Sequence, residues 1–169
     1  MSEVKGSMVG TAGWFALILL VVSLTALAPI PSNSQALTAE HGIITVPQLD
    51  GNRRFSLEGD WLLKQPGEEE HLKKVPSVAW EQGSGTYRVT LLWEGGPTQF
   101  EFFTNNVGTS YELWLNESLV GSSGRYSPVA EQSRPSAKPL IHEFVLLPGS
   151  NVLQVKISNF VHPRAGLWE

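Results

Sequence analysis

Alternation of apolar and polar residues is the feature that most constrains the fold of this chain of 169 residues. In the segment 86–93, every second residue from Tyr87 to Trp93 is apolar, and the segments 110–116 and 151–159 repeat the pattern. Because successive side chains of a β-strand point to opposite faces, each segment predicts a strand with one face toward a core.

Shorter segments extend this pattern along the chain. They lie at 42–46, 60–64, 98–104 and 141–147, and Gly- and Pro-containing breakers follow the strands at 94–97 and 148–151. Downstream of residue 37, no segment shows a sustained helical stripe with start and stop signals. The nearest, 68–74, predicts one solvated helical turn or a loop. Seven or eight short strands at this spacing predict an all-β domain built as a two-sheet sandwich.

The N-terminal segment predicts export. No charged residue occurs between Lys5 and Glu40, and the block from Trp14 to Ala28 is apolar over 15 residues. A signal-peptide core needs about 7–15 apolar residues and a membrane span about 20, so the length favours a signal peptide. The better of two small-x-small cleavage sites is 34–36, because Pro29 follows the other. An uncleaved anchor is the alternative.

These boundaries predict three parts. The ranges are 1–36 for the signal peptide or anchor, 37–54 for an N-terminal extension or first strand, and 55–169 for the β-sandwich.

Composition excludes several function classes. The chain has 12 basic and 16 acidic residues, a net charge of −4 and no basic block, which disfavours nucleic-acid binding. It has no cysteine, so it has no disulfide and no thiolate nucleophile. The four histidines are scattered without a metal-binding spacing, and neither a nucleophile elbow nor a phosphate loop occurs. Many pairs of glutamates could reach the separation of roughly 5–10 Å that the two carboxylates of a glycosidase need, but glutamates on solvated strand faces are the better explanation. We therefore expect no catalytic residues, no metal site and no cofactor.

Tryptophans and strand-end polar residues are the candidates for ligand binding. Indole rings stack on sugar rings, and the alternative for each tryptophan is a place in the core. Trp61 and Trp93 continue apolar strand faces and are expected in the core. Trp114 is out of phase with its strand, so it faces solvent or marks a strand buried on both sides. Trp80 and Trp168 lie in irregular context and are candidates for ligand contact.

Two segments complete the predicted site. The long irregular stretch 121–139 contains Arg125, and the closing segment 158–168 contains Asn159, His162 and Arg164. We expect these segments to meet at one end of the sandwich, where the arginines would donate forked hydrogen bonds to ligand oxygens. Alternatively, these polar groups cap strand ends and fix the loops, or either arginine pairs with a glutamate.

Four motifs in order resemble a known family. They are LEGDWLL at 57–63, GTYRVTLL at 85–92, YELWLNESLVGSSGRYS at 111–127 and LQVKISNFVHPRAGLW at 153–168. Together they resemble the extracellular β-rich sensor domain found ahead of bacterial seven-transmembrane receptors with diverse intracellular signalling modules. Two departures are Glu117, where that family usually has Gly at the turn, and the end of the chain at Glu169, where that family continues into a linker and membrane helices.

The resemblance implies a galactose-binding-like jelly-roll domain at the periplasmic face of the bacterial inner membrane, truncated at its C-terminus. It implies a carbohydrate or similar small ligand, with the seven-transmembrane and cytoplasmic signalling modules as partners. The rival hypothesis is an accessory sugar-binding β-sandwich of an exported glycoside hydrolase of the β-galactosidase/β-glucuronidase type, which carries similar strands. A structural module without a ligand is the third alternative.

Overall fold

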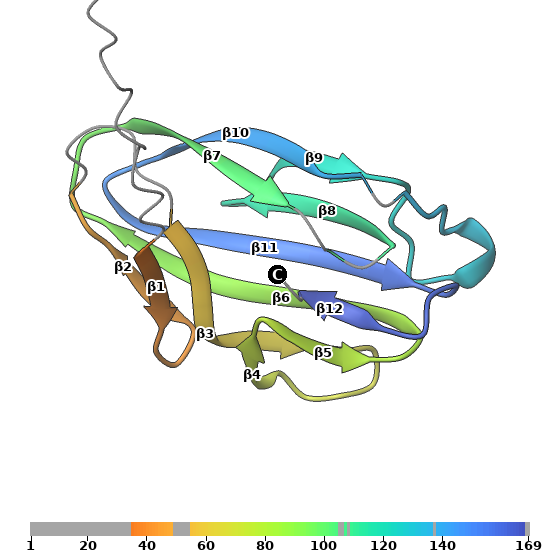
Figure 1. Cartoon of the computed structure of the whole chain (residues 1–169). Coiled ribbons are helices and arrows are strands. Elements are labelled where there is room, and N and C mark those ends of the chain that lie inside the picture. The colour runs from red at the N-terminus through yellow and green to blue at the C-terminus, as the bar shows by residue number, and fades with distance from the viewer. Residues whose placement is uncertain (1–34, 49–54, 105–106, 108, 137, 168–169) are drawn as a thin grey trace, which may run out of the picture. The chain divides into compact units, whose positions relative to one another are not determined.

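The computed structural model describes residues 35–48, 55–104, 107, 109–136 and 138–167 (Figure 1). These residues contain strands, one short 3₁₀ helix and no α-helix. The strands are β1 (Gln35–Ala39), β2 (Ile43–Val46), β3 (Phe55–Lys64), β4 (His71–Val75), β5 (Ser77–Trp80), β6 (Gly83–Trp93), β7 (Thr98–Thr104), β8 (Ser110–Leu115), β9 (Ser118–Ser123), β10 (Leu140–Leu146), β11 (Gly149–Asn159) and β12 (Ala165–Leu167), and the 3₁₀ helix is η1 (Ala130–Gln132).

The main sheet has the strand order β1-β3-β6-β11-β8-β9, with β2 added to β6 and β4 added to β3. Its centre is β11, which runs antiparallel to both β6 and β8. The pairs β7–β10 and β5–β12 form two further antiparallel two-stranded sheets. Figure 1 shows them in front of the main sheet, so the domain is an all-β sandwich.

The alternating residues of the sequence form the core between the layers. Leu153, Val155 and Ile157 of β11 are fully buried, and Tyr87 and Val89 of β6 lie beside them with no exposed surface. The predicted places of Trp61 and Trp93 in the core are confirmed, with exposed fractions of 1% and 5%. From β7 and β10, Phe100, Phe102 and Phe144 pack against this cluster.

Trp114 takes the solvent side of the two alternatives left open by its phase. It is half-buried on the outer face of the main sheet, where its Nε1 donates to Glu112 Oε2 at 3.0 Å. Lys156 Nζ lies 4.2 Å from the centre of its ring. Its polar neighbours thus hold the indole against the sheet surface.

Several elements differ from the sequence prediction. The prediction of a helical turn or loop at 68–74 is wrong for its second half, because His71–Val75 forms β4 and pairs with Gly59–Leu63 of β3. Strands β1, β5, β9 and β12 were not predicted, since they are short and lack clear alternation. The stretch 121–139 was predicted to be irregular throughout, but it opens within β9 and includes η1. Residues 1–34 of the predicted signal segment 1–36 lie outside the described residues, and Gln35 and Ala36 belong to β1.

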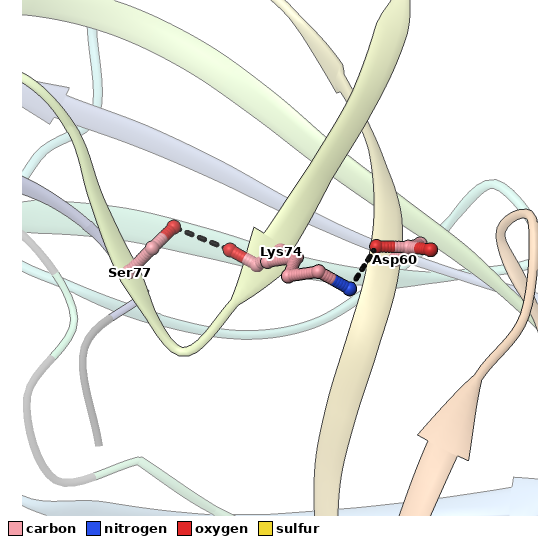
Figure 2. Close-up of polar contacts among 3 residues, drawn as sticks. All are labelled: Asp60, Lys74 and Ser77. Carbon is pink, nitrogen blue, oxygen red and sulfur yellow. Dashed lines mark hydrogen bonds and ion pairs between the residues drawn. The ribbon is translucent and has the colours of Figure 1, made fainter.

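A surface contact fixes the path from β4 to β5. Lys74 Nζ lies 3.0 Å from Asp60 Oδ1 of β3, and the Ser77 hydroxyl donates to the carbonyl of Lys74 (Figure 2). The lysine side chain is 80% exposed, so the ion pair contributes at most about 1 kcal/mol. Its consequence is local, because it positions the start of the strand that carries Trp80.

Candidate functional site

The predicted site residues gather at the end of the sandwich where β11 ends and β6 begins. Ser158 of β11 pairs with Ser84 of β6, and Asn159 pairs with Gly83. The loop between β9 and β10 (residues 124–139) and the closing segment between β11 and β12 (residues 160–164) both meet the sheet here. The structure therefore brings the two predicted segments to the same end.

Buried hydroxyl groups fasten the loop 124–139. The Oγ atoms of Ser110, Ser133 and Ser158 lie 2.8–3.2 Å from one another, and all three residues are buried. The backbone N–H of Ser127 also donates to Ser158 Oγ at 3.2 Å. Since each hydroxyl can donate one bond and accept others, the serines satisfy one another inside the core. The loop is thereby tied to the strands β8 and β11.

A backbone bridge closes the same loop on itself. The amide of Arg125 donates to the carbonyl of Arg134 at 2.9 Å, and the reverse bond is 3.0 Å. Gly124, with φ of +67°, makes the turn into this bridge, and a Cβ there would lie 2.3 Å from the Arg134 carbonyl oxygen. The backbone of Arg125 is thus fixed while its side chain is exposed.

Asn159 fixes the closing segment. Its Nδ2 donates to the carbonyls of Glu81, His162 and Arg164 at 2.7–3.0 Å, and its Oδ1 accepts from the amides of Val161 and His162. The residue has no exposed surface. Of the two roles open in the sequence, the structure gives Asn159 the structural one, because these backbone groups and the Thr109 hydroxyl use both ends of its amide.

His162 and Arg164 are exposed on the segment that Asn159 holds. The backbone N–H of Arg164 lies 3.2 Å from His162 Nδ1. In the part of the chain that the structure describes, neither Arg125 nor Arg164 forms an ion pair with a carboxylate. The alternative of a salt bridge to glutamate is therefore not the arrangement seen, and both guanidinium groups face solvent.

The two tryptophans of the predicted site differ in outcome. Trp80 is half-buried, pairs with Ala165 and stacks on Tyr87 at 6.0 Å with an interplanar angle of 24°. Its ring covers Gly85, where a Cβ would lie 2.7 Å from the indole Cη2. Most of this ring thus serves the core. Trp168 lies outside the described residues.

Tyr126 is a neighbour of Arg125 that the sequence analysis did not single out. It is half-buried, and burial raises the pKa of its phenol, with the Glu112 carboxylate raising it further and the Ser84 hydroxyl opposing the shift. The phenol therefore lies within electrostatic reach of Glu112 on β8 and Ser84 on β6. The sequence signal was the adjacent pair Arg125-Tyr126 within the quoted motif.

The residues of the predicted site are not those that line the hollow found in the structure. This shallow hollow of about 500 Å³ is lined by Thr38, Glu40, His41, Ile43 and Thr45. Ile43 pairs with Thr90, so this hollow lies toward the opposite end of β6. Within the described ranges no three metal-ligating side chains cluster, and no helix there is long and apolar enough to cross a membrane.

Comparisons with known proteins give similarity of fold. No protein-family model matches the chain, and no curated protein matches it. A structure described as a β-galactosidase from Bacteroides fragilis has a TM-score of 0.49 and 16% identity, covering 64% of this chain and 21% of that one. The β-glucuronidase of Bifidobacterium dentium has a TM-score of 0.46 and 18% identity, and that of Dictyoglomus thermophilum has a TM-score of 0.49 and 16% identity. Each similarity covers 68% of this chain and 21% of the enzyme. The matched region spans about a fifth of each enzyme. A likeness at this level assigns no activity to the chain.

Proposed function

We propose that this domain is a non-catalytic recognition module that binds a carbohydrate or similar polyol at the end of the sandwich formed by Arg125, His162 and Arg164. The observation that carries the proposal is the pair of hydrogen-bonded anchors at the end of β11, made by two neighbouring residues. Ser158 holds the loop of Arg125, and Asn159 holds the segment of His162 and Arg164. Binding would therefore order side chains but little backbone, which lowers its entropic cost.

The chemistry of these groups suits oxygen-rich ligands. A guanidinium presents its donors in a planar fork that matches two neighbouring oxygens, which an ammonium does less well. Imidazole adds a hydrogen-bond donor or acceptor.

In the larger protein, we propose that this module is the periplasmic sensor of a bacterial membrane receptor. The ordered motifs from Leu57 to Trp168 and the apolar segment 14–28 support this role. Sequencing the DNA downstream of codon 169 tests it. Seven apolar segments of about 20 residues followed by a signalling module are expected, whereas a catalytic barrel would transfer the module to an exported glycoside hydrolase.

Ligand recognition is tested on the full chain with a panel of mono- and oligosaccharides, using calorimetry for every saccharide that binds. Arg125→Ala combined with Arg164→Ala should weaken binding at least tenfold. Lys64→Ala is the matched control, since it removes an exposed cation at the end of β3. Failure of the whole panel to bind, or equal affinity of the double variant and the wild type, would refute the site.

A further inference from the structure

One edge of strand β7 has no partner strand in the part of the chain that the structure describes. Over its full length, Thr98–Thr104, it pairs with Leu140–Leu146 of β10 (Figure 1). Within the described residues, no strand pairs with its other edge. An edge strand exposes a row of backbone N–H and C=O groups that can accept a further strand. The edge of β7 is therefore a candidate interaction surface.

The outer face of this two-stranded sheet has a specific chemistry. Glu101 of β7 lies directly opposite Glu143 of β10, and the next pair along the strands is Phe103 with Ile141. Phe103 and Ile141 are each 61% exposed. Like charges directly opposite each other destabilise a sheet, and neither glutamate forms an ion pair with any described residue. Glu143 receives one hydrogen bond, from Gln99 Nε2 at 2.9 Å.

This chemistry disfavours a second copy of the chain as the occupant. Glu101 is the central residue of β7, so antiparallel pairing of two β7 strands about their centres would place Glu101 opposite its own counterpart. A third strand with a basic residue at that position would instead neutralise the two carboxylates. An apolar or aromatic residue two positions away would cover Phe103.

The direction of the added strand follows from β12. Leu167 of β12 forms an antiparallel bridge with Val107, the described residue just beyond β7. A strand that lies along β7 on the side of this bridge would run in the same direction as β12. Its alternate residues would point inward beside Phe100 and Phe102, which are half-buried and pack on the core.

We propose that the free edge of β7 binds an extended segment of a partner polypeptide. The segment runs antiparallel to β7, with apolar residues inward, Lys or Arg opposite Glu101 and an aromatic residue beside Phe103. The residues of this surface, Thr98–Thr104, are not those of the proposed ligand site, so this proposal does not rest on ligand binding there.

Three capped heptapeptides test the proposal on the full chain. In antiparallel pairing, acetyl-VYVKVTV-amide places its lysine opposite Glu101 and its tyrosine beside Phe103. The reversed sequence acetyl-VTVKVYV-amide has the same composition but places the tyrosine beside Gln99. In acetyl-VYVEVTV-amide, glutamate replaces the lysine. Binding is followed by ¹⁵N-resolved NMR titration and by hydrogen exchange of the amides of 98–104.

The first peptide should bind and slow amide exchange in β7. Because one cross-strand pair contributes modestly, the reversed peptide should bind about threefold more weakly. The glutamate peptide replaces an attractive pair with a repulsive one, so it should bind about tenfold more weakly. Glu101→Lys should reverse the preference between the lysine and glutamate peptides, and it should fold because the new lysine faces Glu143. Glu131→Lys is the matched control on η1 and should change nothing.

Three outcomes would overturn the proposal. They are the absence of any change in β7 with all three peptides, an unchanged preference in Glu101→Lys, and concentration-dependent dimerisation of the free chain through β7. The first would leave Glu101 as a residue that only prevents edge-to-edge association.

Discussion

The phenol oxygen of Tyr111 lies 2.9 Å from Nε2 of His142, and this contact joins the main sheet to the β7–β10 sheet. The two rings meet edge to face at 5.7 Å, and the phenol also lies 2.6 Å from Thr104 Oγ1. Gly121 of β9 makes room for the imidazole, since a Cβ there would lie 2.0 Å from Nδ1. A polar link therefore crosses the core where aliphatic packing would be expected.

The link should make stability depend on pH. Burial lowers the pKa of His142 below its ordinary value of 6.5, and its hydrogen-bond partner, the Tyr111 phenol, carries no charge at neutral pH. The unfolded state therefore binds the proton more readily. The contribution of neutral His142 to the free energy of unfolding is fully present above pH 6.5. It is lost as the pH falls from there toward the lower folded-state pKa, by at most about 1.4 kcal/mol per pH unit.

Urea denaturation between pH 7.5 and 4.5 measures this dependence. His142→Gln should reduce the slope near pH 6, because glutamine can still bond to Tyr111 but does not titrate. His71→Gln, at an exposed position on β4, is the control and should keep the wild-type slope. An equal slope in wild type and His142→Gln would show that another group is responsible.

Tyr87 should be the last tyrosine to ionise while the domain remains folded. Burial raises its pKa to about 12, and the approaches of the Leu167 backbone and the Ser77 hydroxyl oppose the shift only in part. Neither contact has hydrogen-bond geometry, since the phenol has no bonded partner among the described residues. Because the folded pKa lies above the ordinary value of 10, stability should be lost as pH rises above 10.

Absorbance at alkaline pH tests this order. Tyr87→Phe should remove the highest-pH step of the tyrosine titration and reduce the loss of stability above pH 10. If the highest step persists in this variant, it belongs to Tyr111 or Tyr126, whose pKa values are also raised by burial.

Ser158→Ala should loosen the loop that presents Arg125. The change removes the hydroxyl that contacts Ser110, Ser133 and the amide of Ser127, leaving buried polar groups without partners. Such a loss costs about 1–3 kcal/mol, measured by urea denaturation. Hydrogen exchange should accelerate in residues 125–136. Ser122→Ala, exposed on β9, should be neutral.

Asn159→Asp keeps the shape of the side chain but removes the hydrogen bonds that Nδ2 donates. Aspartate can still accept from the amides of Val161 and His162 but cannot donate to the three carbonyls that Nδ2 contacts. We expect a loss of at least about 2 kcal/mol by urea denaturation. A variant as stable as wild type would show that water satisfies those carbonyls and that the hydrogen bonds from Nδ2 are not needed for stability.

The strands that carry the core could be predicted because their alternation is strong. In β6, β8 and β11, buried residues alternate with more exposed residues along most of the strand. The period of two is therefore visible in the sequence. Strand β4 could not be predicted in this way. Its residues HLKKV include two adjacent lysines and do not alternate between apolar and polar, and pairing with β3, rather than burial, makes it a strand.

The candidate site shows the same division. Polar residues at strand ends suggested the two segments, and the pairing of β11 with β6 and β8 brings these segments to one end of the sandwich. The sequence could not separate Asn159 from Arg164, since both are polar residues of one short segment. Burial and hydrogen bonding separate them, because Asn159 contacts three carbonyls that only the folded chain brings together.

By itself, the sequence determined an all-β sandwich, the faces of its central strands and the residues of its core, because local periodicity reports which side of a strand is apolar. The tertiary structure decided which strands pair, which polar residues are buried and where a sheet edge stays open. These depend on contacts between residues far apart in the chain, such as Ser110 with Ser158 and Glu101 with Glu143. No local pattern encodes those distances.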